Sequence, residues 1–196
     1  MLVYADIFIS IDTLTYNFSV MKTGQINIEI ARGKISDLAA DIYVLPYYPD
    51  HVSPDCERHD AEYAGARGVR KFVDFRLSRI KNQEPLRMGE TFITDSLGGK
   101  SRLLANVVCR ASNENIEEMK KAIHSGIIDL LMQSENHNIH TVALTPLCAR
   151  DGLEVGDFCK VLVETIKEFR ASHSIEKITI ITKHDERYKA LEDFFK

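Results

Sequence analysis

Residues 115–147, NIEEMKKAIHSGIIDLLMQSENHNIHTVALTPL, predict a helix that leads into an apolar strand. Asn115 and Glu118 have the spacing of a capping box, which favours a helix that begins here. HTVALTPL (140–147) forms the short apolar run of a buried strand. The apolar stripe of the helix consists of Ile116, Met119, Ile123, Ile127 and Leu130. The stretch therefore predicts one helix–strand unit of an α/β fold.

The same alternation continues on both sides of this unit. The sequence predicts strands at ETFITDS (90–96), LANVVCR (104–110) and KITIIT (177–182), and helices at 155–169 and at ERYKALEDFF (186–195). The first of these helices has an apolar stripe of Val155, Phe158, Leu162, Ile166 and Phe169, and Asp185 can cap the second. Because strand and helix alternate, we expect right-handed crossovers and a largely parallel central sheet covered on both faces.

The N-terminal part predicts additional strands before this alternation begins. The segments LVYADIFISI (2–11), LTYNFSV (14–20) and QINIEIARG (25–33) are expected to be antiparallel neighbours at one side of the sheet. A short helical turn at ISDLAAD, a strand at DIYVLPYY that Pro46 stops, and a helix over about residues 60–80 are predicted next. No linker or repeat marks a boundary, so residues 1–196 are predicted to form one domain, with 1–24 as extra N-terminal strands.

Composition and charge narrow the expected partners and compartment. Lys and Arg number 25 against 29 Asp and Glu, a formal charge of -4, so nucleic acid and anionic membranes are not expected as partners. The N-terminus has no secretory pattern, and no segment approaches the roughly 20 apolar residues of a membrane span. Four cysteines without a CxxC pair suit a reducing compartment, with Cys109 and Cys159 in the core. We therefore expect a cytoplasmic protein.

Four segments follow one another in an order that points to a known fold. They are INIEIARGKISDLAADIYVLP (26–46), GARGVRKFV (65–73), GETFITDSLGGKSRLLANVVCR (89–110) and TPLCARDGLEVGDFCKVLVETIKEF (145–169). Their order and spacing resemble the macro domains that bind ADP-ribose, and Gly33, Ile35 and Asp41 match that family's first turn and following strand. The resemblance runs from about Gln25 to the C-terminus. It implies a divergent member with a three-layer α-β-α sandwich and a central mixed, largely parallel sheet.

The resemblance also implies which residues contact the ligand. They are Gly33, Lys34 and Ile35 in the first turn, Tyr47 and Tyr48 at a strand end, Gly65, Ala66, Arg67, Gly68 and Val69 in the glycine-rich segment, and Cys148, Ala149, Arg150, Asp151 and Gly152 in a second phosphate loop. Three departures predict an atypical pocket. Lys34 replaces the family's adenine-binding aspartate, Leu45 and Tyr48 replace two asparagines, and Arg70 replaces an aspartate of the hydrolase branch.

The residue types themselves favour an anion site at two turns. Backbone amides at a helix N-terminus can converge on a diphosphate, and glycine lets the backbone approach closely. GARG (65–68) and ARDG (149–152) both have this composition, and Arg67 and Arg150 can add charge-assisted bonds. A structural interpretation stays open for each part. The glycine pair also lets a helix pack on the sheet, the second turn can be an ordinary one, and the two tyrosines can complete the core.

Other reactive groups favour structural interpretations. A polar surface loop without metal is expected for His51, Asp55, Cys56, His59 and Asp60, because their spacing matches no metal motif. Cys148 ends a predicted strand without a visible basic partner, so a buried or incidental thiol is expected there. The basic residues between 67 and 81 are expected to form a solvated helix face, with a local patch for an anionic ligand or nucleic acid as the open alternative. No cofactor is expected.

Function stays open between three hypotheses. The first is a binding module for ADP-ribose or a related nucleotide diphosphate. The second is an enzyme that removes ADP-ribose, with Asp151 or Lys34 as candidate acid–base groups, so whether the chain is an enzyme is undecided. The third is a ligand-free domain that acts in assembly and forms homo-oligomers through its N-terminal strands.

Overall fold

The computed structural model describes residues 19–23, 25–47, 86–96, 100–110, 115–149, 151–169 and 171–196. Their strands are β1 (Ser19–Thr23), β2 (Ile26–Arg32), β3 (Ile42–Tyr47), β4 (Thr91–Asp95), β5 (Leu103–Val108), β6 (Thr141–Leu144) and β7 (Lys177–Thr182). Their helices are α2 (Ile116–Gln133), α3 (Val155–Glu168) and α4 (Asp185–Phe195), with a 3-10 turn η1 at Ile35–Asp37. Each element from β4 onward falls on a segment that the sequence predicts for it. The predicted helix over residues 60–80 lies outside the described residues.

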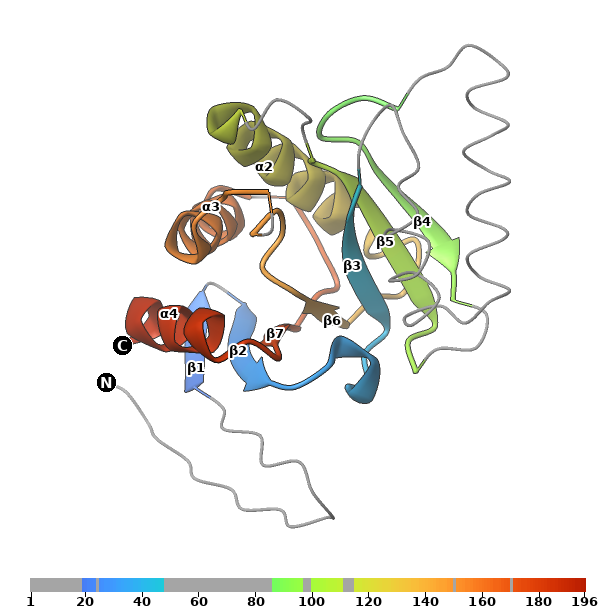
Figure 1. The fold of residues 1–196 in the computed structure, drawn as a ribbon. Coiled ribbons are helices and arrows are strands. Elements are labelled where there is room, and N and C mark those ends of the chain that lie inside the picture. Colours follow the sequence, from blue (N-terminus) through green and yellow to red (C-terminus); the bar gives the residue numbers. More distant parts are fainter. Residues whose placement is uncertain are drawn as a thin grey trace.

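The described strands form one mixed sheet in the order β1-β2-β7-β6-β3-β5-β4 (Figure 1). Neighbouring strands from β2 to β5 are parallel, whereas β1 is antiparallel to β2 and β4 is antiparallel to β5. β1 pairs antiparallel with β2, as expected at this side of the sheet, but it runs from Ser19 to Thr23 and shares only Ser19 and Val20 with the predicted segment 14–20. The predicted segments before Ser19 lie outside the described residues. The sheet is therefore mixed and largely parallel, as predicted.

Helices α2, α3 and α4 lie together over one face of the sheet (Figure 1). Asn115 caps α2, because its side-chain oxygen accepts a hydrogen bond from the Glu118 amide at 3.1 Å. The predicted stripes face the sheet: Met119, Ile123, Ile127, Leu130, Val155, Phe158, Leu162 and Ile166 are buried, and Ile116 and Phe169 are partly buried against them. None of the described helices is both long and apolar enough to span a bilayer.

The opposite face of the sheet carries a second buried cluster. Successive residues of β3 alternate between the two clusters, with Val44 under the helices and Tyr43 and Leu45 on the opposite face. Other members of this cluster are Ala31, Ile35, Tyr47, Phe92, Leu104, Val108, Ala143 and Ile181. The inner strands are buried on both faces of the sheet, so their sequences are continuously apolar instead of alternating between apolar and polar residues.

Two predicted boundaries are wrong. Pro46 does not stop β3, which continues to Tyr47. The Tyr47 carbonyl accepts bonds from β5-side amides, so the adjacent Pro46 faces β6, whose pairing with β3 already ends at Val44. Pro46 has no N–H group, but no hydrogen bond between β3 and β6 is lost, because these strands no longer pair at this position. Asp185 is not the cap of α4, because His184 occupies that position and Asp185 is the first helical residue, ion-paired with Arg32.

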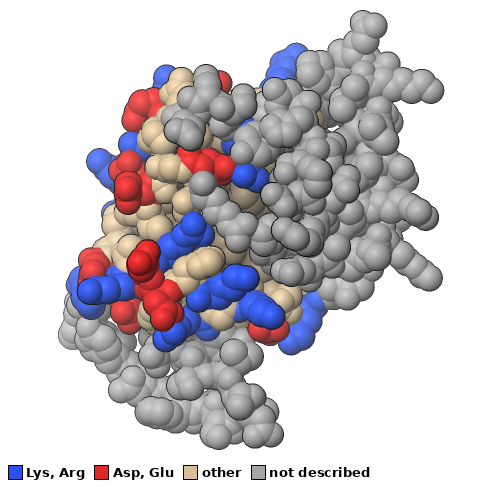
Figure 2. Space-filling view, viewed as in Figure 1, with Lys and Arg blue, Asp and Glu red and all other residues tan. Residues whose placement is uncertain are grey.

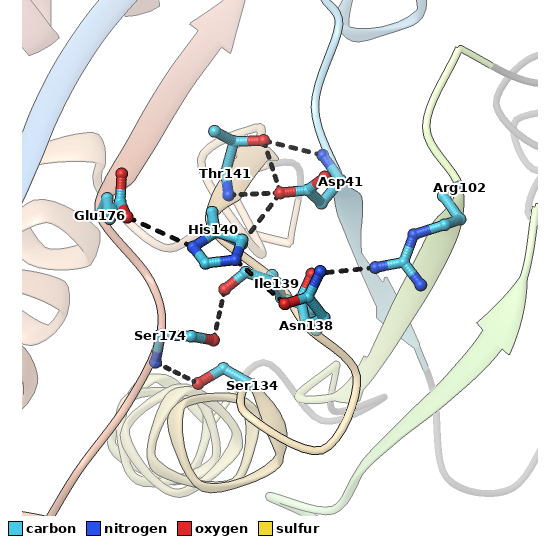
Figure 3. A network of polar contacts seen from close by, with 9 residues as sticks. All are labelled: Asp41, Arg102, Ser134, Asn138, Ile139, His140, Thr141, Ser174 and Glu176. Carbon is cyan, nitrogen blue, oxygen red and sulfur yellow. Dashed lines mark hydrogen bonds and ion pairs between the residues drawn. The ribbon is translucent and has the colours of Figure 1, made fainter.

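Asp41 ties the amino-terminal ends of two neighbouring strands together (Figure 3). One carboxylate oxygen accepts hydrogen bonds from the His140 amide at 2.9 Å, the Thr141 amide at 2.8 Å and the Thr141 hydroxyl at 3.0 Å. Burial by itself raises the pKa of Asp41, but these bonds and the charge of Arg102 outweigh it, so the pKa is lowered. This network lies at the end of the sheet opposite the candidate site and holds the strand starts in register.

Candidate functional site

The candidate site lies at the carboxyl end of the sheet, where β2, β3, β5, β6 and β7 finish. In parallel sheets, ligands bind beyond this end, in loops that lead into helices. The structure brings residues 33–35, Tyr47 and the loop after β6 to this end of the sheet. The other predicted ligand residues, namely Tyr48, Gly65, Ala66, Arg67, Gly68, Val69 and Arg150, lie outside the described residues.

The β6–α3 loop, residues 145–154, is a tight turn held by apolar anchors. The Cys148 carbonyl accepts bonds from the amides of Asp151 at 2.8 Å and Leu153 at 3.3 Å. Leu147 and Leu153 are buried on either side of the turn. Gly152 has φ +94, a conformation that side chains rarely adopt. Among the described residues, a β-carbon built at Gly152 would meet the Ile116 side chain alone, at 3.8 Å, so these residues leave room for close approach to the backbone here.

The β6–α3 loop places the N-terminus of α3 at the carboxyl end of the sheet. At this end of α3 the Phe158 amide donates to the carbonyl of the N-cap residue Glu154, at 3.0 Å. The amides of residues 155–157 therefore precede the helical ladder, and the Glu154 side chain does not cap them. Lys120 of α2 contacts Asp157 at 2.9 Å, which ties this first turn to the neighbouring helix. The geometry suits an anion that accepts bonds from these amides.

Asp151 is held by an arginine that sequence reasoning missed. Arg110, just beyond β5, donates to both Asp151 carboxylate oxygens, at 2.9 and 2.6 Å. The two side chains are only 20% and 9% exposed, so this bidentate pair is largely shielded from water. Arg187 of α4 also reaches the loop, with a 3.4 Å bond to the Ala149 carbonyl. The one signal for Arg110 in the sequence is its position directly after a buried strand.

The turn after β2 forms a second part of this end of the sheet. The Gly33 amide donates to the Thr182 carbonyl of β7 at 3.1 Å, and Arg32 pairs with Asp185 at the start of α4. Ile35 is buried in the core, whereas Lys34 is exposed. Of the three predicted ligand residues here, Lys34 therefore presents the most accessible polar group.

Tyr47 lies inside the second core cluster and is only 1% exposed. This position agrees with the interpretation that the strand-end tyrosines complete the core. Contact between Tyr47 and a ligand stays a prediction. The amides of Cys109 and Arg110 both donate to the Tyr47 carbonyl, at 3.1 and 2.9 Å, so β3 and β5 end in register beside the loop.

Cys148 is a buried thiol, as expected from its lack of a basic partner. Its sulfur lies 3.2 Å from the Cys109 sulfur, and both residues are fully or almost fully buried. Burial and the contact with Cys148 raise the pKa of the Cys109 thiol well above its ordinary value. Cys109 and Cys159 lie in the core, as predicted.

No group of three or more His, Cys, Asp or Glu side chains in the described ranges could hold a metal ion. The cluster of His51, Asp55, Cys56, His59 and Asp60 lies outside these ranges. Basic and acidic side chains are interspersed over the described part of one face, so any recognition of an anion there is local (Figure 2).

No family model and no curated protein matches the chain in sequence. The structure is nevertheless similar to solved macrodomains. That of Oceanobacillus iheyensis with MES bound has a TM-score of 0.77 at 14% identity, covering 92% of this chain and 96% of that one. A mutant of it with ADPR has a TM-score of 0.76 at 14% identity, covering 91% and 96%. The Trypanosoma brucei macrodomain in complex with ADP has a TM-score of 0.68 at 12% identity, covering 86% and 69%. The predicted three-layer α/β fold of the macrodomains is therefore confirmed.

Proposed function

We propose that this chain, which has the macrodomain fold, binds ADP-ribose or a related nucleoside diphosphate at the carboxyl end of its sheet. The observation that carries the proposal is the structural match, along more than nine-tenths of the chain, to the Oceanobacillus iheyensis macrodomain with ADP and to a mutant of it with ADPR. Fold alone does not establish function, so the proposal rests also on the chemistry of the β6–α3 loop.

Backbone amides are the main donors that this loop offers to a diphosphate. An anion can approach the backbone at Gly152 and accept hydrogen bonds from the amides of residues 155–157 without any rearrangement of the buried core. The helix dipole of α3 favours negative charge at the same point. Because Arg110 already balances the charge of Asp151, these two side chains together leave the loop nearly neutral. In the described part of the loop the attraction for a diphosphate therefore comes mainly from oriented dipoles, to which Arg67 and Arg150 can add charge-assisted bonds.

The pocket differs from that of a standard family member on the side of the base. Lys34 is a donor only, so it cannot accept a bond from an exocyclic amine. Its ammonium group suits an acceptor of the ligand, such as a phosphate or hydroxyl oxygen. We therefore infer that the nucleotide base is held by packing and backbone contacts rather than by a carboxylate.

We favour a binding module over a hydrolase because the Asp151 carboxylate is already engaged by Arg110. As a general acid or base, this carboxyl would have to exchange a proton, yet both of its oxygens accept charge-assisted bonds from Arg110. No observation on the described residues favours Lys34 in that role either. The hydrolase and the assembly through residues 1–24 remain predictions.

Calorimetric titration and thermal melting with ADP-ribose test the proposal. We expect saturable binding and a rise in Tm that grows with ligand concentration. Gly152→Val places a branched side chain in a left-handed conformation over the loop and should weaken binding at least tenfold.

Asn138→Ala is the matched control, because Asn138 also has a positive φ, of 50°, but lies at the opposite end of the sheet. This variant should lose some stability and keep the affinity of the parent protein. Equal affinities for all three proteins, or no binding at millimolar ADP-ribose, would refute the proposed site.

A further inference from the structure

Two thiols lie in contact directly beside the Arg110–Asp151 ion pair. The Cys148 sulfur is 3.2 Å from the Cys109 sulfur and 3.3 Å from the Cys109 carbonyl oxygen. Cys109 directly precedes Arg110 in the sequence, and Cys148 is the first residue of the turn that contains Asp151. The end of β5 and the β6–α3 loop are thus joined at two adjacent points, one ionic and one through sulfur.

The backbone gives no reason of its own for a cysteine at position 148. Cys148 has φ +58, in the left-handed region where glycine or asparagine is sterically favoured. What the cysteine adds is its sulfur, which is aimed at the one thiol that lies within reach among the described residues. A disulfide has its sulfurs about 2.05 Å apart, so an approach of about 1.2 Å converts this contact into a bond.

We propose that Cys109 and Cys148 are a modification site, which a hydroperoxide converts into an internal disulfide when the β6–α3 loop opens. One thiol loses its proton and attacks a peroxide oxygen; the O–O bond breaks, and a sulfenic acid and one water form. The second sulfur attacks the sulfenic sulfur, the S–S bond forms, and the hydroxyl leaves with the second proton as water. Two thiols lose two electrons, and hydrogen peroxide is reduced to two waters.

Burial couples this reaction to the ligand site, a step that rests on the proposed function. Cys109 and Cys148 are 0% and 2% exposed, so peroxide reaches them only in molecules whose loop is open. A ligand that binds only the closed loop lowers the open fraction by a factor of 1 + [L]/Kd. At ten times Kd, bound ADP-ribose should therefore slow disulfide formation about tenfold.

The test treats the native full chain with hydrogen peroxide, with and without ADP-ribose, then alkylates the remaining thiols and maps the peptides without reduction. We expect a peptide pair linked through Cys109 and Cys148, with a mass about 2 Da below the two thiol peptides. The disulfide closes a covalent ring of about forty residues, so it should raise the Tm of the protein by roughly 5–10 °C.

Two variants separate this site from general thiol oxidation. Cys148→Gly removes the sulfur and suits the left-handed backbone, so this variant should not form the link. Cys159→Ala is the matched control, because Cys159 is an equally buried thiol on α3 that has no second thiol beside it in the described part of the chain. The control should form the Cys109–Cys148 link at the rate of the parent protein.

The proposal is overturned if Cys109 and Cys148 stay fully alkylatable after peroxide treatment, or if either is linked to Cys56 instead. A link that forms equally fast with and without bound ADP-ribose overturns the coupling to the loop. Absence of any melting shift with ADP-ribose counts against the proposed function alone, since the peptide map then still decides the modification. The map of the parent protein also decides it if Cys148→Gly fails to fold.

Discussion

At the scale of single residues, the Arg110–Asp151 pair shapes the β6–α3 loop. Replacing one partner removes the bidentate pair from a largely buried charge, which is more costly than removing both charges. We predict that Arg110→Gln lowers the free energy of unfolding by about 2 kcal/mol, and that adding Asp151→Asn recovers part of this loss. Denaturant unfolding of the two single variants and the double variant measures the coupling. Strictly additive losses would contradict it.

Replacing Arg110 and replacing Asp151 should change the affinity for ADP-ribose in different ways. Arg110→Gln removes the positive charge that pairs with the Asp151 carboxylate beside the proposed diphosphate and should weaken binding of ADP-ribose. Asp151→Asn removes the negative charge instead and should weaken binding less, or strengthen it. Titration of both variants at low and high salt measures this difference, which screening should reduce. Equal effects at low salt would mean that the pair acts only on loop structure.

Asp41 predicts a pH dependence of stability. Its pKa is lowered in the folded protein, so its contribution is fully present above the ordinary carboxyl pKa and is lost as pH falls through the lower folded value. The free energy of unfolding should therefore drop below about pH 4. Asp41→Asn should be less stable at pH 7 by about 1–2 kcal/mol and should show a flatter acid limb. Identical acid limbs in the two proteins would exclude Asp41 as a source of this slope.

At the scale of elements, α2 packs directly on the sheet at Gly126. A β-carbon there would lie 2.4 Å from a Val107 methyl group and 3.1 Å from the Thr91 hydroxyl, which itself donates to the Gly126 carbonyl. Gly126→Ala should therefore destabilise the protein by about 1–3 kcal/mol, because α2 must move away from β5.

Gly156→Ala is the matched control for this packing prediction. A β-carbon at Gly156 of α3 meets no atom of the described residues within 4 Å, so alanine there should be neutral or slightly stabilising. Thermal melting of both variants decides the matter. Similar Tm values for the two would mean that α2 and β5 are not in close contact at Gly126.

Local patterns predict most of these elements, because each depends on residues close together in the chain. The helical stripe from Met119 to Leu130 and the cap at Asn115 are complete within single segments. The contacts of the candidate site are different, since Arg110 and Asp151 are 41 positions apart and Cys109 and Cys148 are 39 apart. Only the parallel pairing through β3, which brings the ends of β5 and β6 close together, makes these neighbours. Local periodicity contains no information about that pairing.

At the level of the whole molecule, the fold brings residues 33–35, Tyr47 and the loop after β6 to one end of the sheet. A ligand contact of the glycine-rich segment at residues 65–69 stays a prediction. The order of four weak sequence segments identified the fold even though identity to the solved macrodomains is only 12–14%. The substituted positions, above all Lys34, are where that resemblance gives no guidance, because a changed donor or acceptor changes the ligand that fits.

NMR titration of ¹⁵N-labelled protein with ADP-ribose reports both whether the ligand binds at the carboxyl end of the sheet and which residues it contacts. We predict saturable shifts at Gly152, at the amides of residues 155–157 and at the turn of residues 33–35, with small changes around Asp41 and Thr141 at the opposite end of the sheet. No shifts at millimolar ADP-ribose, or shifts centred on that opposite end, would rule out binding at the β6–α3 loop.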